Sequence, residues 1–256
     1  MIFQDYILKF IIILPSIFIA GFVDSIAGGG GLISVPAYLA AGIPPHFALG
    51  TNKFSSTFGT LFATITYKKN RMIDLKIALI AGVFALLGSS LGAKTVLLIR
   101  PDFLRYILIF LIPIITGFVL VKKDFGMVDR SKSIDGKKSF FLSSIAGLII
   151  GFYDGFFGPG TGTFLILFFS LFLKYDFRMS NGNTKVVNLS SNVAALITFI
   201  INGKVLFLIG IPAAICGIAG NLLGSKFAVQ KGNRLIKIFF VLVLVILFVK
   251  ILLDTF

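Results

Sequence analysis

The chain has 256 residues, of which 57% are hydrophobic and 13% are charged, and its formal net charge at pH 7 is +14. A soluble domain carries about 25% charged residues, so this composition excludes a soluble globular protein and indicates a membrane protein with several spans. Lysine and arginine in cytoplasmic loops account for the positive charge, because they set the orientation of membrane proteins. No soluble basic domain is left to bind a nucleic acid.

Five apolar segments come first in chain order, and each is predicted to be a membrane helix. They occupy residues 6–27, 31–42, 47–67, 75–98 and 103–121. The first has no basic region ahead of it and no clear cleavage site, so it is predicted to be a retained helix and not a signal peptide. The second is short, since a helix of this length spans only about 18 Å of a ~30 Å hydrocarbon core. It is expected either to enter as a tilted half-helix or to turn back.

A second set of five apolar segments follows a basic stretch, KKDFGMVDRSKSIDGKK. These segments occupy residues 139–157, 161–173, 182–201, 205–225 and 234–253, and the second of them is again short. We therefore predict a first membrane repeat at residues 1–123, a basic cytoplasmic linker at 124–137 and a second membrane repeat at 138–256.

Three motifs recur in the same order in the two sets, which indicates a duplication. GFVDSIAGGGG at 21–31 matches GFYDGFFGPGT at 151–161 with an offset of 130 residues. TNKF at 51–54 corresponds to NTKV at 183–186, where Lys53 matches Lys185 at an offset of 132. At that same offset, GSSLGAK at 88–94 matches GNLLGSK at 220–226.

Lysine and arginine counts in the loops predict how often the chain crosses the membrane. If the short segments count as crossings, one side holds sixteen of these residues and the other holds four. If the short segments return to the side they entered, the division is twelve to eight. The positive-inside rule prefers the first arrangement. Five crossings per repeat is an odd number, so we predict an all-α membrane protein with about ten spans in two inverted repeats and both termini outside the cytoplasmic membrane.

The most similar part of the repeat is a glycine-rich break ahead of each short segment. Its residues are Gly28, Gly29, Gly30 and Gly31 in the first repeat and Gly158, Gly160 and Gly162 in the second. Interrupted segments at matching positions of inverted repeats point to a substrate site at the middle of the membrane. A helix that starts after such a break turns its first N–H groups toward the site, and Thr161 is a candidate N-cap, so we expect a small anion as ligand. The alternative is that the glycines only let helices pack closely.

Two aspartates and two lysines lie deep within apolar segments, where a charge costs at least about 2.5–3.5 kcal/mol. Asp24 matches Asp154 in the repeat, and Lys53 matches Lys185. The sequence leaves open whether each aspartate pairs with the lysine of its own repeat or with that of the other repeat. We interpret the lysines as ligand or counter-charge groups. The aspartates are interpreted as structural or proton-relay groups, because a carboxylate repels an anion.

Amide and hydroxyl side chains close to the lysines complete the candidate site. Such groups need partners in lipid, and an oxyanion offers several acceptors at once. The candidates for substrate binding, besides the glycines, Thr161 and the two lysines, are Thr51, Asn52, Asn183, Thr184 and Asn188. Ser55, Ser56, Asn181, Ser190, Ser191 and Asn192 are further polar side chains in the same two segments. The second repeat is the richer one, so the site is expected to be asymmetric.

An enzyme is a poor match to this sequence. It has no H-E-x-x-H motif, and no Walker A motif for ATP. The paired aspartates resemble those of intramembrane aspartyl proteases, but the G-x-G-D element of those enzymes is absent. One histidine, His46, and one cysteine, Cys216, make no metal site. We predict a protein that is not an enzyme and uses no metal or cofactor.

The stretch GFVDSIAGGGGLISVPAYLAAGIPPHFALGTNKF, with its degenerate second copy, resembles the TauE/SafE family of membrane permeases, also called sulfite exporters. The resemblance covers essentially the whole chain. Glycines 28–31, Pro36, Gly42 and GTN at 50–52 match the first motif of the family; Gly158 and Gly160 match the second, where Pro159 replaces another glycine. The resemblance implies a small-anion transporter, with sulfite and organosulfonates such as sulfoacetate among its proposed substrates.

These observations together predict a secondary transporter that moves a small anion across the cytoplasmic membrane by alternating access, with sulfite or an organosulfonate as the expected substrate. Its expected partners are the anion, the lipid bilayer and, as the driving force, either protons or the membrane potential. The alternatives are an anion channel or facilitator on the same scaffold, a permease for small carboxylates, and a membrane subunit that transports nothing. The sequence predicts no oligomeric state.

Overall fold

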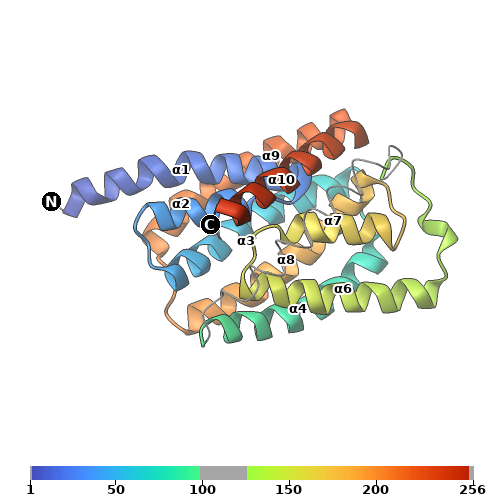
Figure 1. Cartoon of the computed structure of the whole chain (residues 1–256), viewed down its shortest axis with the longest axis horizontal. Helices are drawn as coiled ribbons and strands as arrows, with labels where there is room; N and C mark the ends of the chain where they lie inside the picture. Colours follow the sequence, from blue (N-terminus) through green and yellow to red (C-terminus); the bar gives the residue numbers. More distant parts are fainter. Residues whose placement is uncertain (1, 99–125, 254–256) are drawn as a thin grey trace.

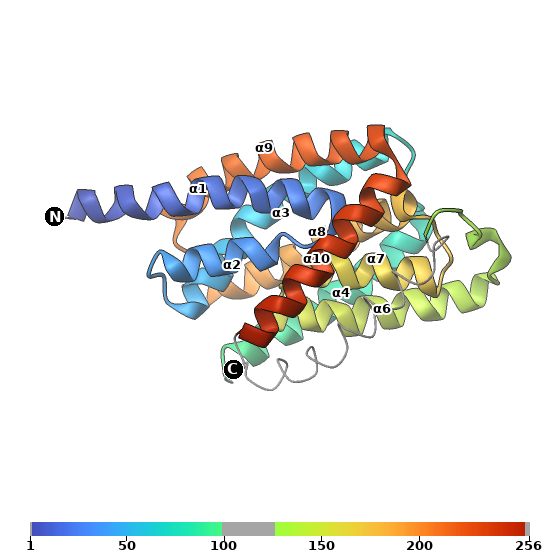
Figure 2. The same cartoon turned by 45° about the horizontal axis from the view of Figure 1, so that its top comes forward.

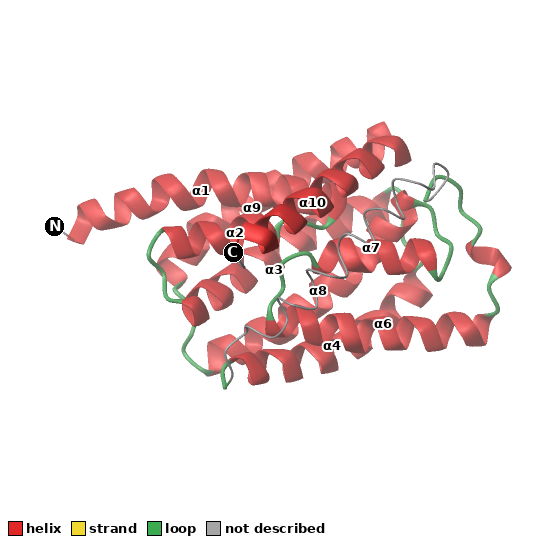
Figure 3. Cartoon of the chain, viewed as in Figure 1, coloured by secondary structure: helices red, strands yellow, loops and turns green. Residues whose placement is uncertain are grey.

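The computed structural model describes residues 2–98 and 126–253, and helices and loops without a strand make up this part of the chain (Figures 1 and 3). Before the gap lie α1 (Ile2–Ala27), α2 (Gly31–Ala40), α3 (Pro45–Lys69) and α4 (Leu75–Val96). After it come η1 (Ser131–Ser133), α6 (Gly136–Phe156), α7 (Thr161–Leu171), α8 (Phe177–Ile201), α9 (Phe207–Lys231) and α10 (Asn233–Leu253). The predicted segment at 103–121 lies outside the described residues.

The structure confirms the predicted all-α fold, and its helices have the lengths and apolar composition expected of a membrane protein. Within the described residues, five helices are long and apolar enough to cross a membrane: α1 from Lys9 onward, α4, α6, α8 and α9. The two short helices are also present, α2 with 10 residues and α7 with 11. At 1.5 Å per residue each spans only about 15–17 Å, so neither crosses a ~30 Å hydrocarbon core alone.

Aspartates fix where three of the long helices begin. The side chain of Asp74 accepts a hydrogen bond from the N–H of Ile77 at the start of α4, over 3.3 Å. Asp176 accepts one from Met179 over 2.8 Å at the start of α8, and Asp135 accepts one from Lys137 over 2.9 Å at the start of α6. The first N–H groups of a helix have no partner within it, and these carboxylates supply one.

The two parts of the chain interleave in the bundle. α1 packs against α9, α4 packs against α6 and α8, and α3 packs against α8 and α9. The views in Figures 1 and 2 show that α1 and α6 run in opposite directions, and so do α2 and α7. The glycine breaks, at the ends of α1 and α6, therefore approach the middle of the bundle from opposite sides.

The most closely packed helix pairs are built on glycine, and they match one another in the repeat. A Cβ atom on Gly92 of α4 would overlap the carbonyl oxygen of Phe152 on α6. The equivalent Gly224 of α9 stands in the same relation to the carbonyl oxygen of Phe22 on α1. Small residues let membrane helices approach closely, and here each contact joins the two halves of the chain.

The surface and the interior have the polarity that a bilayer requires. Large apolar side chains such as Leu79, Leu87 and Leu91 on α4 and Ile211 and Ile215 on α9 are more than half exposed. The buried faces of α3 and α8, by contrast, carry hydroxyl, amide and lysine side chains. Polar groups that cannot meet water in lipid must find partners inside the protein, so this interior is where a site is to be sought.

Replacement of Gly155 by alanine is predicted to destabilise the bundle, because a Cβ atom there would overlap the carbonyl oxygen of Ser89 on α4. Overpacking of this kind costs about 1–3 kcal/mol. The matched control is Gly136→Ala, since nothing lies within 4 Å of a Cβ atom at that position of the same helix. Thermal unfolding of the purified variants in detergent measures the difference, and equal midpoints for both would contradict this account of the α4–α6 contact.

Candidate functional site

The first glycine break begins where α1 ends, at Ala27. Gly28 has a φ of +78°, a backbone conformation that residues with a side chain rarely adopt, and the chain restarts as α2 at Gly31. The last carbonyls of α1 find a partner in α8: the Asn181 amide donates to the carbonyl oxygens of Ser25 and Ile26 over 2.9 and 2.7 Å. This amide satisfies the open end of α1 inside the bundle.

The second glycine break follows α6 and uses two glycines with positive φ. Gly158 has φ +91° and Gly160 has φ +85°. The expectation that Thr161 is the N-cap of the short helix is wrong, because Gly160 occupies the cap position and Thr161 is the first residue of α7. From there the Thr161 hydroxyl donates back to the carbonyl oxygen of Gly158 over 2.7 Å, which closes the loop on itself.

The two breaks touch each other. The N–H of Thr163 donates to the carbonyl oxygen of Gly28 over 3.2 Å, and its hydroxyl donates to Ala27 over 3.0 Å. A Cβ atom on Gly28 would overlap the backbone of Gly162, and one on Gly162 would reach within 2.6 Å of the backbone of Gly28. Close packing is thus a correct explanation for these two glycines, but both also line a cavity.

Several N–H groups at the two breaks have no acceptor. Within the part of the chain that the structure describes, no hydrogen bond is formed by the N–H groups of Gly30, Gly31 or Gly162. Gly31 and Gly162 lie in the first turns of α2 and α7, where the helix dipole is positive. Two helix N-termini from opposite halves therefore offer free donors at one place.

The buried charges pair across the two halves of the chain. Lys53 Nζ lies 2.7 Å from an Asp154 carboxylate oxygen, and Lys185 Nζ lies 3.0 Å from an Asp24 carboxylate oxygen. Pairing within each repeat, one of the two arrangements the sequence allows, is therefore wrong. Each cation has a further acceptor, since Lys53 donates to the Asn192 amide oxygen over 3.0 Å and Lys185 donates to the Asp24 carbonyl.

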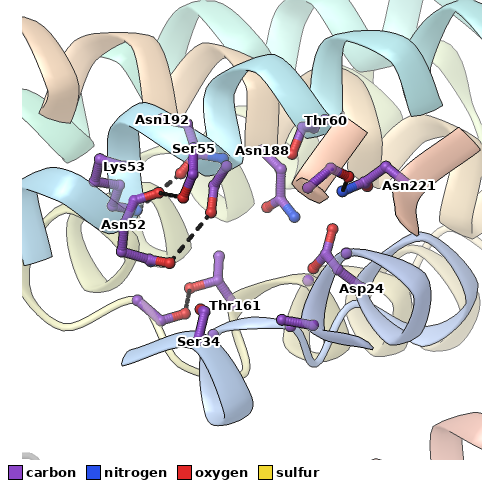
Figure 4. Close-up of a pocket in the computed structure, with 18 of the residues that line it drawn as sticks. Asp24, Ser34, Asn52, Lys53, Ser55, Thr60, Thr161, Asn188, Asn192 and Asn221 are labelled. Atoms are coloured by element: carbon purple, nitrogen blue, oxygen red, sulfur yellow. Dashed lines mark hydrogen bonds between the residues drawn. The ribbon is translucent and has the colours of Figure 1, made fainter. Parts of the chain in front are cut away.

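A cavity of about 50 Å³ lies between these groups. A cavity that admits one water has about 10–15 Å³ on the same scale, so this one accommodates a few waters or one small polyatomic ion. Polar side chains of α3 and α8 line one side of it, and the two glycine breaks with Ser34 and Thr161 line the other (Figure 4). The predicted site residues in its wall are Asp24, Gly28, Gly30, Gly31, Asn52, Lys53, Asp154, Gly158, Thr161, Gly162 and Asn188.

Six residues in the predicted set lie outside this wall. Thr51 and Asn183 match in the repeat, and each holds the start of another helix: Leu206 N–H donates to the Thr51 hydroxyl and Asp74 N–H to the Asn183 amide oxygen, over 3.0 and 2.8 Å. Lys185 lies fully buried behind Asp24. The other three are Gly29, which faces Val243 of α10, Gly160, which caps α7, and Thr184, which is buried in α8.

Other wall residues are absent from the predicted set. Ser34, Thr60 and Asn221 line the cavity and are buried, with exposed fractions of 4% or less. Ser55, Ser56 and Asn192, which the sequence marks only as nearby polar residues, line it as well. Asn221 had a detectable signal, because it lies in the repeated motif GNLLGSK, whereas Ser34 and Thr60 belong to none of the three repeated motifs.

The comparisons with known proteins identify a family of membrane proteins. The profile of the family described as sulfite exporter TauE/SafE matches residues 13–251. The probable membrane transporter protein ORF9 of Sinorhizobium sp is 38% identical, over 93% of this chain and 90% of its own. YfcA of Escherichia coli K12, also called a probable membrane transporter protein, is 35% identical over 93% and 87%.

A third relative, the probable membrane transporter protein of Haemophilus influenzae, is 36% identical over 86% of this chain and 85% of its own. No solved structure matches the chain significantly. The family profile covers most of the chain, and the relatives align over nearly their whole length. The chain therefore belongs to the sulfite exporter TauE/SafE family and is a membrane transporter, not an enzyme.

Proposed function

We propose that this transporter is a secondary permease that moves a small oxyanion across the cytoplasmic membrane, with sulfite or a small organosulfonate as the substrate. The observation that carries the proposal is that the N–H groups of Gly30, Gly31 and Gly162 find no acceptor among the residues that the structure describes, and that these three residues line the small cavity. N–H groups at helix N-termini bind oxyanions without further charge. The family's description as sulfite exporters supports the same substrate class.

The charges around the cavity favour a site that binds and releases its anion. Lys53 is neutralised by Asp154 and Lys185 by Asp24, so the four buried charges sum to zero. An unpaired lysine would hold an anion strongly in a medium of low dielectric constant. Attraction by N–H dipoles and by the amides of Asn52 and Asn188 is weaker, as transport requires.

The size of the cavity bears on the choice of substrate. A cavity of about 50 Å³ is small, since one water already needs about 10–15 Å³. It matches sulfite, which has four non-hydrogen atoms, better than an organosulfonate, which is larger and would require the walls to move apart. We therefore propose sulfite as the primary substrate, and organosulfonates as substrates that bind only with a rearrangement.

We further propose that the two halves are inverted repeats that together cross the membrane about ten times and support alternating access. The opposite directions of α1 and α6, and of α2 and α7, support this arrangement (Figure 2). So do the repeat-related contacts, in which α4 packs on α6 as α9 packs on α1. A site at the interface of inverted repeats can open to either side when one helix bundle rocks against the other.

Protons are proposed as the coupling ion, with Asp24 as their carrier. The Asp24 side chain is 18% exposed and the Asp154 side chain only 7%, so Asp24 is the more accessible of the two carboxylates in the cavity wall. Protonation of Asp24 would remove its charge from the wall and would free Lys185 to attract the incoming anion.

Proteoliposomes loaded with labelled sulfite test the function directly. We expect saturable flux that a pH gradient accelerates, together with counterflow, which marks a carrier and would be absent in a channel. Asn188→Ala should lower the flux at least about tenfold, because it removes a hydrogen-bonding group worth about 1.5–3 kcal/mol with a charged ligand. Asn202→Ala, an exposed residue at the end of the same helix, should leave it unchanged. Equal flux in both variants would place the anion elsewhere.

Charge removal separates a structural role of Lys53 from a role in binding. Lys53→Met alone leaves Asp154 buried and unpaired, which costs about 3–5 kcal/mol, so the yield of folded protein should fall. The double variant Lys53→Met/Asp154→Asn removes both charges and should recover most of the yield. We expect transport by the double variant to remain low; full transport would show that the pair serves folding only.

The membrane orientation is tested with reporter fusions. About ten spans place both termini outside the cytoplasm and the segment at 126–135 inside it. A reporter active only outside the cytoplasm should give a signal at the C-terminus and none when inserted at 126–135. A cytoplasmic C-terminus would contradict the inverted arrangement.

A further inference from the structure

A second cavity lies away from the transport site, in a groove at the beginnings of α4 and α6. It has a volume of about 460 Å³ and lies between the start of α4, the segment that contains η1, and Tyr175. Candidate spans begin at Leu75 in α4 and at Gly136 in α6, so this groove lies at the level where a bilayer has its headgroups.

The charged side chains of the groove are mostly cationic. Lys76, Lys132 and Lys137 line it and are exposed, and Asp74 is the one acidic side chain in its wall. Within the described residues, none of the three lysines forms an ion pair. Lysine amines gathered at the end of membrane helices attract anionic headgroups.

The acidic groups in and near the groove are occupied by other partners. Asp74 accepts hydrogen bonds from the Ile77 N–H and, over 2.6 Å, from the Tyr175 hydroxyl. Burial and the neighbouring Asp74 carboxylate raise the pKa of Tyr175, so its hydroxyl stays protonated and keeps donating. Asp129 accepts from the Ser131 N–H, and Asp135 caps α6. Lys76, Lys132 and Lys137 are therefore available to bind an anionic ligand.

Apolar side chains complete the groove. Ile77, Ile80, Ile134 and Phe140 line it together with the lysines. On the same helix faces the apolar surface continues into the lipid-exposed region, where Leu79 is 55% exposed and Phe140 52%. An apolar wall of this kind adds nothing to the binding of a soluble anion, whereas the acyl chains and glycerol backbone of a lipid can lie along it.

We propose that this groove binds an anionic phospholipid, with its phosphate among Lys76, Lys132 and Lys137 and its acyl chains along α4 and α6. The bound lipid connects the segment between the two halves of the chain to the start of α4 and stabilises that arrangement. The proposal does not depend on the transported substrate, since none of these residues lines the transport cavity.

The test measures lipid binding and thermal stability of the purified full chain in detergent. Phosphatidylglycerol should bind in native mass spectra and raise the unfolding midpoint by several degrees, and phosphatidylcholine with the same acyl chains should do neither. The triple variant Lys76→Gln/Lys132→Gln/Lys137→Gln should lose about 100-fold in affinity, about fivefold for each lysine. Inorganic phosphate is the third ligand; if it stabilises the protein as well as phosphatidylglycerol does, the site binds a soluble anion and the lipid proposal fails.

The matched control is Lys68→Gln/Lys69→Gln/Lys231→Gln, which removes three exposed lysines at helix ends that do not line the groove. It should bind phosphatidylglycerol as the unmodified protein does. Equal losses in both triple variants would mean general attraction to basic residues and would overturn the proposal. If the groove variant folds poorly, Lys132→Gln alone, on the 3-10 segment, should still lower the affinity about fivefold, and no change would contradict the site.

Discussion

The backbone contact between Gly28 and Gly162 is the constraint on which the rest of the site depends. A membrane helix that breaks in lipid leaves N–H and C=O groups without partners, and each costs free energy in hydrocarbon. Here the carbonyl of Gly28 is satisfied by Thr163, and those of Ser25 and Ile26 by Asn181, all from the other half of the chain. Among the described residues that line the cavity, Gly30, Gly31 and Gly162 have N–H groups without an acceptor.

Several contacts come in pairs that the repeated sequence motifs relate to each other. Exchange of the two halves converts Lys53–Asp154 into Lys185–Asp24, and the hydrogen bond of Leu206 with Thr51 into that of Asp74 with Asn183. The symmetry is broken inside the cavity, where Lys53 lines the wall and Lys185 does not. Both carboxylates, Asp24 and Asp154, line the cavity, so the two pairs differ in the lysine alone.

Much of the fold and part of the candidate site were predictable from the sequence. The features that were not predictable depend on contacts between segments that are distant in the chain. Composition and the repeated motifs predicted helices, two short segments and the glycine breaks, because these follow from local hydropathy and glycine content. The partner of Asp24 was not predictable, since the repeat is compatible with Lys53 as well as Lys185. Thr51 and Asn183 were predicted to bind the ligand because buried polar side chains in a membrane protein need a partner. Their partners are instead the first N–H groups of two other helices, which satisfy a hydrogen-bond acceptor as well as a ligand would.

The ion pairs that cross between the halves have a consequence for how the chain is made. Asp24 and Lys53 enter the membrane early in synthesis, but their partners Lys185 and Asp154 are translated more than a hundred residues later. The nascent first half must therefore carry both charges without their final partners until the second half arrives. A protein of half this length would lack both partners.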